Sequence, residues 1–437
     1  MQVNAKQLYK KIPKPLKNMV ELIGRYRIIN SKTFKKQYQL LEQASELNID
    51  SLEKMQFQLL KDTLQYAYEN VPYYHEMFDD IKFDVYNFSN IEEMKKIPYL
   101  NKDIIVKQWD KMQVNEINNF YYSTTGGTTG KSVKFAFDNS SLYKERAFVY
   151  HYWSKYGYDY KKSKLISFRE IEFEGKLYKR NMLYNELLIN PFMLDSKHID
   201  RIVEEIYNFA GAFLYGYPSN IAIFCRLLKK NNIKFKLPIK AILLISENLY
   251  PDQKKQIEQV FDCPIAMFYG HTEKAVFAEK YGDSYLFNSL YGFTEILDEE
   301  EDNVVCTGFI NRKMPLIRYR VDDKVIKTDK GYEIIGHRSN ELLYGKNDYV
   351  ISATTLEFTH EDCFEKVDAY QFEQNEIGKV TMRLESEQVI DIKELDAIKE
   401  KAKEKLPGFE INTVQTDKIV RTSRGKHKII IQNISEN

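Results

Sequence analysis

The decapeptide Tyr122-Ser-Thr-Thr-Gly-Gly-Thr-Thr-Gly-Lys131 holds three glycines and five serine or threonine side chains, and it ends on a lysine. Glycine lets the backbone turn and bring its N–H groups close to a ligand. Serine and threonine add hydrogen-bond donors, and lysine adds a positive charge. The pattern therefore predicts a phosphate-binding loop. Its expected binding residues are Ser123, Thr124, Thr125, Gly126, Gly127, Thr128, Thr129, Gly130 and Lys131.

A Walker A loop is the first alternative for this stretch. Its G-x-x-x-x-G-K-[ST] pattern matches Gly130-Lys-Ser132, but Thr125 stands where the first glycine is needed. No strongly apolar strand precedes the loop either. A P-loop phosphotransferase is therefore disfavoured, and the other alternative is an ordinary turn rich in glycine and threonine.

A second candidate is Phe268-Tyr-Gly-His-Thr-Glu273, which follows the apolar run Cys263–Phe268. The apolar run predicts a buried strand. Tyr269 could stack on a flat ring, Thr272 could donate to a phosphate, and Glu273 could hold Mg²⁺, which prefers carboxylate and phosphate oxygens. Taken alone, the segment is equally well explained as an exposed turn.

Three further polar segments follow in order along the chain: Pro315–Asp323, Ile335–Leu343 and Arg421–Lys426. Each alone looks like a charged turn beside a strand. The whole series, in this order, resembles the adenylate-forming enzyme superfamily. Within it, the sequence is most similar to the phenylacetate–CoA ligase branch and its CapK-like proteins of capsular polysaccharide biosynthesis.

Other segments support the same resemblance over most of the chain. Asn70-Val-Pro-Tyr-Tyr74 and Ile97-Pro-Tyr-Leu-Asn-Lys102 are similar to the phenylacetate–CoA ligase branch. Tyr215-Gly-Tyr-Pro-Ser219 and Gly336–Lys346 favour the CapK-like group.

The resemblance implies a role for each motif. Residues Ser123 to Lys131 would surround the β- and γ-phosphates of ATP, Thr272 would contact the α-phosphate, and Glu273 would carry magnesium. Tyr269 would stack on adenine. Asp323, assisted by Arg338, would accept the ribose hydroxyls. Lys426 would bridge the α-phosphate and the incoming carboxylate, and the small domain that carries it would rotate about a hinge at Asn340.

Position in the predicted sheet adds four residues to the nucleotide site. Ligands of parallel sheets bind beyond the carboxyl ends of the strands. Ser246, Glu247, Gly270 and His271 fall at such ends. A lone histidine in a turn is more often structural than catalytic.

The sequence departs from the family pattern at three places. The usual Gly-Asp is here Asp322-Asp323, and the register favours Asp323 as the ribose ligand. The hinge position, commonly aspartate, is Asn340, a residue that tolerates unusual backbone angles. Some relatives have apparent zinc ligands where this chain has Glu279-Lys-Tyr281 and Asn288, so we expect no zinc.

The periodicities predict an α/β fold in two parts. Strands at Ala212–Tyr215, Ile239–Ile245 and Pro264–Phe268 alternate with helices that begin at Pro218 and Pro251, which indicates a mostly parallel sheet flanked by helices. A helix is also expected over residues 51–71. We predict an AMP-binding domain over residues 1–336. Residues 337–437 would form a small α+β lid with a hairpin (Glu365–Phe372, Lys379–Glu385) and a helix (Ile392–Leu406).

Composition favours a cytoplasmic enzyme without nucleic-acid partners. The net charge is +1, from 64 basic and 63 acidic residues, so there is no global field for a polyanion. The four cysteines are far apart, as in a reducing compartment. Residues 1–37 are the exception, with ten basic residues and one acid, and this segment could contact a membrane.

The sequence thus predicts an AMP-forming ligase that uses ATP and Mg²⁺ to activate a small carboxylate. The sequence does not decide which acceptor takes the acyl group: coenzyme A, an amino sugar, or another thiol, amine or hydroxyl. It also does not decide whether the protein is a homodimer. The alternatives are an acyl-CoA ligase of the phenylacetate type and a non-catalytic nucleotide-binding scaffold of a glycan assembly complex. The presence of Lys426, Glu273 and Asp323 together disfavours the scaffold alternative, in which the catalytic residues would have been lost.

Overall fold

The structure is a computed structural model. It describes residues 13–124, 133–169, 175–194, 196–297, 304–321, 323–335, 342–346, 350–352, 362–421 and 428–434. All four cysteines are free. Within these ranges no helix is both long and apolar enough to cross a bilayer.

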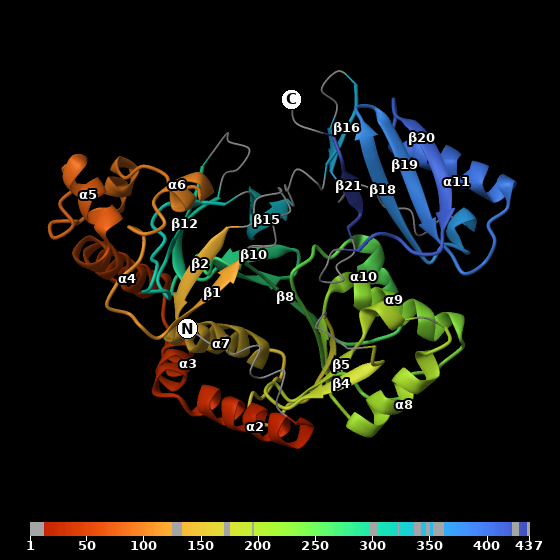
Figure 1. The fold of residues 1–437 in the computed structure, drawn as a ribbon, viewed down its shortest axis with the longest axis horizontal. Helices are drawn as coiled ribbons and strands as arrows, with labels where there is room; N and C mark the ends of the chain where they lie inside the picture. Colours follow the sequence, from red (N-terminus) through yellow and green to blue (C-terminus); the bar gives the residue numbers. More distant parts are fainter. Residues whose placement is uncertain are drawn as a thin grey trace.

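A ten-stranded sheet forms the body of the molecule, with the strand order β14-β15-β10-β9-β8-β7-β6-β3-β5-β4 (Figure 1). Its centre, from β5 to β8, is parallel, and the flanking pairs are antiparallel. The expected α/β fold with a parallel sheet flanked by helices is confirmed. The strands are β3 (Leu165–Phe168), β4 (Tyr178–Asn181), β5 (Glu186–Ile189), β6 (Phe213–Gly216), β7 (Ala241–Leu244), β8 (Ile265–Gly270), β9 (Phe277–Tyr281), β10 (Ser284–Phe287), β14 (Lys324–Thr328) and β15 (Gly331–Ile335).

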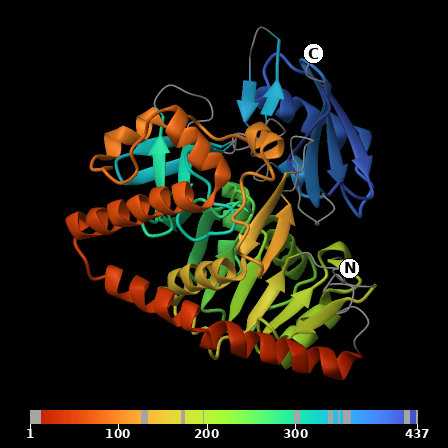
Figure 2. The ribbon, with the colours of Figure 1, turned by 60° about the vertical axis from the view of Figure 1, so that its left-hand side comes forward.

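Helices cover both faces of the parallel strands because successive side chains point to opposite faces. Leu165 and Phe213 pack on one side, toward α7, and their neighbours Ile166 and Leu214 pack on the other. Helices α2 (Lys14–Asn30), α3 (Lys32–Ala44) and α7 (Asn139–Ser154) lie on the first side, and α8 (Ile199–Phe209), α9 (Pro218–Lys230) and α10 (Pro251–Glu258) on the second. In Figure 2 the red N-terminal helices run along the outer edge, away from the blue C-terminal part.

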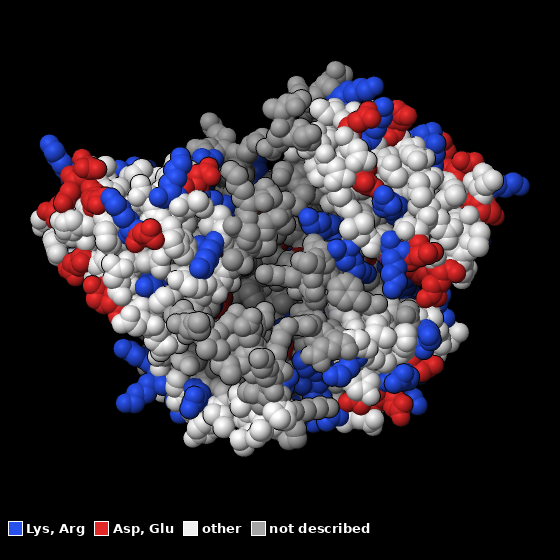
Figure 3. All heavy atoms as spheres, in the orientation of Figure 1, with Lys and Arg blue, Asp and Glu red and all other residues white. Residues whose placement is uncertain are grey.

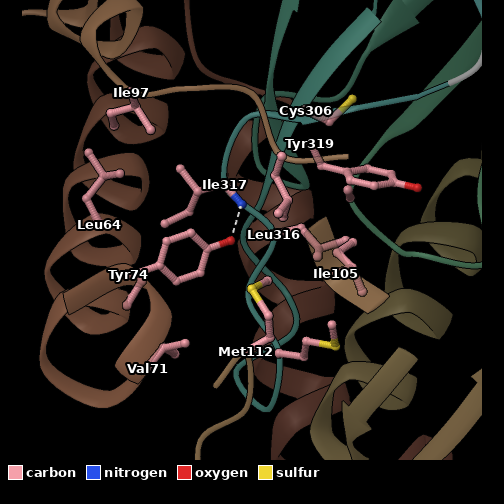
Figure 4. Close-up of a cluster of buried hydrophobic side chains, with 14 of the residues drawn as sticks. Leu64, Val71, Tyr74, Ile97, Ile105, Met112, Cys306, Leu316, Ile317 and Tyr319 are labelled. Carbon is pink, nitrogen blue, oxygen red and sulfur yellow. Dashed lines mark hydrogen bonds between the residues drawn. The ribbon is translucent and has the colours of Figure 1, made fainter. Parts of the chain in front are cut away.

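A third core joins the N-terminal helices to a small sheet. Helix α4 (Ile49–Asn70) ends at Val71, and Pro72 begins the next helix because proline suits the first helical position. The Tyr74 hydroxyl donates to the Pro315 carbonyl (2.9 Å) and accepts from the Ile317 N–H (3.0 Å; Figure 4). The remaining elements here are α5 (Pro72–Asp80), η1 (Ile91–Lys96), α6 (Lys102–Lys107), β11 (Gly292–Ile296), β12 (Val304–Gly308) and β13 (Tyr319–Arg320).

The C-terminal part has a sheet and a core of its own. The sheet order is β20-β19-β18-β21, and helix α11 (Ile392–Lys405) packs on it through Ile398 and Ala402. The strands are β18 (Ala369–Glu376), β19 (Lys379–Glu385), β20 (Glu410–Thr416) and β21 (Ile430–Gln432), beside η5 (Asp362–Phe364) and the pair β16 (Leu342–Tyr344) and β17 (Val350–Ser352). The predicted boundary between residues 336 and 337 lies outside the described residues.

Helix α9 makes polar contacts with the C-terminal part. Lys230 Nζ lies 3.0 Å from Glu387 Oε2 and 3.5 Å from Asp368 Oδ1. The Arg421 guanidinium donates to Asn220 Oδ1 (3.1 Å). A cavity of about 460 Å³ lies beside these contacts, lined by Arg226 among others. Figure 3 shows acidic and basic side chains interspersed on the face in view.

Candidate active site

The glycine- and threonine-rich loop connects the two strands of an antiparallel hairpin. Strands β1 (Phe120–Thr124) and β2 (Lys134–Asp138) pair in register from Phe120 with Asp138 to Thr124 with Lys134. A P-loop would need a strand, a loop and then a helix, so this arrangement rules out the phosphotransferase alternative. Ser123 and the backbone of Thr124 lie at the end of β1 that leads into the loop. The remaining predicted residues, from Thr125 to Lys131, lie outside the described residues.

The turn after β8 brings three predicted nucleotide residues together. The Tyr269 hydroxyl donates to Asp323 Oδ2 (2.8 Å). His271 Nε2 lies 3.1 Å from the same carboxylate oxygen and also contacts the Tyr269 hydroxyl. Asp323 is buried, with only 6% of its surface exposed. Residues 54 positions apart thus form one hydrogen-bonded cluster.

Glu273, the expected magnesium ligand, lies at the buried end of the same turn. Its Oε1 accepts a hydrogen bond from the Tyr319 hydroxyl (3.1 Å), and both side chains are buried. Glu273 follows Gly270, His271 and Thr272, so the expected magnesium, α-phosphate and ribose residues all lie on or against one turn. Within the described ranges no three His, Cys, Asp or Glu side chains gather as a metal site. A Mg²⁺ ion held by Glu273 would therefore take its other ligands from phosphate and water, as this ion commonly does.

Lys274 fixes the turn to helix α7. The sequence patterns did not predict a role for this residue. It is a non-glycine residue in the left-handed region (φ 57°), and its buried ammonium pairs with Glu145 of α7. Burial alone would lower the pKa of Lys274, but the Glu145 carboxylate raises it above its ordinary value, so the Lys274 ammonium stays charged. A Cβ at Gly292 would lie 2.6 Å from the Ala275 carbonyl oxygen, so only glycine lets β11 approach the turn this closely. No spacing rule could have identified Lys274, because its partner is 129 residues away.

The N-terminal motifs hold the segment that leads to Asp323. The Leu100 N–H donates to the Arg318 carbonyl (2.9 Å), and the Arg320 N–H donates back to Leu100 (2.9 Å). Arg318 is buried at a φ of 49° and binds Glu295 through two nitrogen–oxygen contacts of 3.0 and 2.8 Å. Together with the Tyr74 contacts described above, these bonds explain why segments near residues 70–74 and 97–102 accompany the Pro315–Asp323 motif.

Ser246 and Glu247 lie at the carboxyl end of β7, next to β8. Ser246 has a positive φ of 65°. Glu247 Oε2 accepts the Ser219 N–H (3.2 Å) at the first turn of α9, where a negative charge is favourable. Glu247 therefore has a structural task in addition to its expected nucleotide contact. Arg338, Asn340 and Lys426 lie outside the described residues, and so does Asp322.

The fold can be compared with solved structures. The structure of 2-hydroxyisobutyryl-CoA ligase in the postadenylation state superposes with a TM-score of 0.66 at 13% identity, covering 87% of this chain and 90% of that one. The fold is thus that of the adenylate-forming ligases.

Sequence comparison is more specific. The chain is 26% identical to protein CapK of Staphylococcus aureus over 93% of its own length and 96% of CapK. A shorter stretch, 23% of this chain and 24% of the other, is 28% identical to phenylacetate–coenzyme A ligase of Escherichia coli K12. No family model matches the chain. The predicted resemblance to the adenylate-forming superfamily, and within it to the CapK-like group, is confirmed.

Proposed function

We propose that this chain is an AMP-forming ligase that activates a carboxylic acid with ATP and then passes the acyl group to an acceptor. Residues 1–336 would form the nucleotide domain and residues 337–437 the lid. The observation that carries the proposal is the cluster at the end of β8, where Tyr269, His271 and Asp323 touch one another and Glu273 closes the same turn.

In the first half-reaction a carboxylate oxygen of the acid attacks the α-phosphorus of ATP. A new P–O bond forms, the bond to the β-phosphate oxygen breaks, and pyrophosphate leaves. Such a transfer depends on positioning and charge neutralisation more than on covalent catalysis. Asp323 would hold the ribose, Tyr269 would stack on adenine, and Thr272 and the loop from Ser123 to Lys131 would bind phosphates. Mg²⁺ on Glu273 would offset phosphate charge, and Lys426 would join the α-phosphate and the acid.

In the second half-reaction a nucleophile attacks the acyl carbon, the C–O bond to AMP breaks, and the nucleophile loses its proton to solvent. The resemblance to CapK favours an amine or hydroxyl acceptor in surface polysaccharide biosynthesis. Coenzyme A is the second candidate, supported by the shorter match to phenylacetate–coenzyme A ligase.

ATP–pyrophosphate exchange across a panel of carboxylic, hydroxy and amino acids tests the first half-reaction directly. We expect Mg²⁺-dependent exchange with at least one acid, and no exchange by the Lys426→Ala variant, which should still bind ATP. Exchange with none of the acids, although ATP binds, would favour the scaffold alternative. Adding coenzyme A or an amino sugar to a responding acid then identifies the acceptor by the stoichiometric release of AMP.

We further propose that the basic N-terminal region touches an anionic membrane. Helix α2 exposes Leu16, Met19, Val20, Leu22 and Ile23 among basic residues, a pattern typical of helices that lie in the membrane interface.

Vesicle sedimentation tests this contact. Vesicles with anionic lipid should sediment more protein than neutral vesicles, and raising salt should reverse the difference. The double variant Leu22→Ser/Ile23→Ser should reduce sedimentation. Equal sedimentation of variant and wild type would contradict the proposal.

A further inference from the structure

A cluster of tyrosines and arginines lies on the α7 face of the sheet, away from the turn after β8. The Arg146 guanidinium, on α7, lies 4.4 Å from the centre of the Tyr184 ring and 6.0 Å from that of Tyr150. Arg169 directly follows β3, and its guanidinium lies 5.9 Å from the centre of the Tyr215 ring of β6. Two strands and one helix thus bring two guanidinium groups among tyrosine rings.

The two arginines differ in how their charges are satisfied. Arg169 binds Glu186, a fully buried carboxylate that also accepts from Ser167 Oγ (2.6 Å) and Asn181 Nδ2 (2.7 Å). Within the described part of the chain, Arg146 has no hydrogen bond or ion pair, only its ring contacts. Among the described residues the cluster therefore holds one positive charge without a carboxylate partner, and arginine stays protonated in proteins.

Three of the surrounding tyrosines have hydroxyl groups that make no hydrogen bond to a described residue. Tyr150 and Tyr158 are buried, with 5% and 3% of their surface exposed. Among the described residues neither hydroxyl makes a hydrogen bond, and the same is true of Tyr215. Burial raises the pKa of all three phenols above the ordinary value, so they stay protonated and can donate. A guanidinium that has no carboxylate partner in the described part of the chain, together with three phenols that can donate, is complementary to an anion.

The sheet register relates this cluster to the turn after β8. Tyr215 pairs with Leu243 of β7, and Leu243 pairs with Ala266 of β8, three residues before Tyr269. At strand spacings and rises typical of sheets, Tyr215 and Tyr269 are about 10 Å apart across the strands and about 10 Å along them. Helix α7 links the two places as well, since Glu145 binds Lys274 beside Glu273 and the next residue is Arg146.

We propose that Arg146 and the tyrosines Tyr150, Tyr184 and Tyr215 bind a second anionic group of the acid substrate, so that the preferred substrate is a short dicarboxylic or phosphonate-bearing acid. This inference rests on the proposed function. One carboxylate is activated at the turn after β8, and the other anionic group lies on the Arg146 guanidinium. The charge of Arg169 is already balanced by Glu186, so Arg169 is not assigned to the second anionic group.

Exchange assays with acids matched in length test the proposal. The panel consists of the dicarboxylates from malonate to adipate, the monocarboxylate of equal carbon number for each, and 4-phosphonobutyrate. We expect a preference of tenfold or more for one acid with a second anionic group, and the phosphonate arm identifies which anion is preferred. In Arg146→Met this preference should fall by roughly 10- to 100-fold, the range of a charge-assisted hydrogen bond, because exchange with the dianionic acid falls much more than exchange with the monocarboxylate. Equal use of mono- and dicarboxylates by the wild type, or an unchanged preference in Arg146→Met, overturns the proposal.

Arg312→Met is the matched control, because Arg312 is exposed and also stacks on a tyrosine, 4.5 Å from the centre of the Tyr66 ring. It should leave the preference unchanged. If Arg146→Met fails to fold, Tyr215→Phe removes one hydroxyl only and should still lower the preference a few-fold; an unchanged preference there counts against the proposal.

Calorimetric titration of the same acids into the full chain with AMP separates this inference from the proposed function. If no acid supports exchange, the proposed function fails, but binding of a dicarboxylate that disappears in Arg146→Met still supports the anion site. No binding of any dianionic acid overturns it.

Discussion

The Glu273→Gln variant should lose ATP–pyrophosphate exchange by roughly 10²- to 10³-fold, the effect of removing one preorganised charge-stabilising group. Glutamine keeps an oxygen that can accept the hydrogen bond of the Tyr319 hydroxyl, so the fold of the turn should survive. The substitution removes the negative charge that would bind Mg²⁺. The measurement is the exchange rate over a Mg²⁺ titration, and the apparent Mg²⁺ requirement should rise.

Glu279→Gln is the matched control for this experiment. Glu279 is equally buried and lies on β9, the strand that follows the turn with Glu273, but its carboxylate binds Lys155 Nζ (2.7 Å) and Asn288 Nδ2 (3.1 Å). It should lower thermal stability without changing the Mg²⁺ requirement. Tyr319→Phe should give an intermediate loss of exchange, because it releases Glu273 from its fixed position. An unchanged metal dependence in Glu273→Gln would show that the metal lies elsewhere.

Local patterns in the sequence predict most of the sheet and its helices. Apolar runs and prolines place β6, β7 and β8 to within a few residues, and Pro218 and Pro251 mark the starts of α9 and α10. These features depend on side-chain periodicity and on the fixed φ of proline, both of which are local properties.

The long-range contacts that hold the site residues in place could not be predicted in the same way. Tyr74 binds the Pro315–Ile317 backbone, and Glu145 binds Lys274, across separations of 241 and 129 residues. Such contacts are fixed by how the layers pack, and single-sequence spacing carries no record of them. The resemblance predicts that Tyr269 and Asp323 contact the same nucleotide. That they hydrogen-bond to each other through a hydroxyl and a carboxylate became visible only in the structure.

The second large effect is expected at the ribose site, where Asp323→Asn should raise the KM for ATP by about 10- to 100-fold. A carboxylate accepts strong hydrogen bonds from hydroxyl groups, and its loss costs about 1.5–3 kcal/mol. The amide oxygen can still accept from Tyr269, so the cluster stays in place. KM and kcat for ATP in the exchange reaction are the quantities to measure, and kcat should change less than KM.

The neighbouring acid provides the control, because Asp322 is the rival for the same role by sequence. Asp322→Asn should leave the KM for ATP within about twofold of wild type; if it carries the large effect instead, the register that favours Asp323 is wrong.

Two substitutions of Tyr269 separate the role of its hydroxyl group from the role of its ring in the same assay. Tyr269→Phe keeps the ring and loses only the hydroxyl that reaches Asp323 and His271, so the KM should rise a few-fold. Tyr269→Ala also removes the stacking surface, which for a base on an aromatic ring is worth about 1–3 kcal/mol, and should raise the KM further. Equal effects of the two substitutions would mean that Tyr269 serves the ribose cluster alone and that adenine stacks on another side chain.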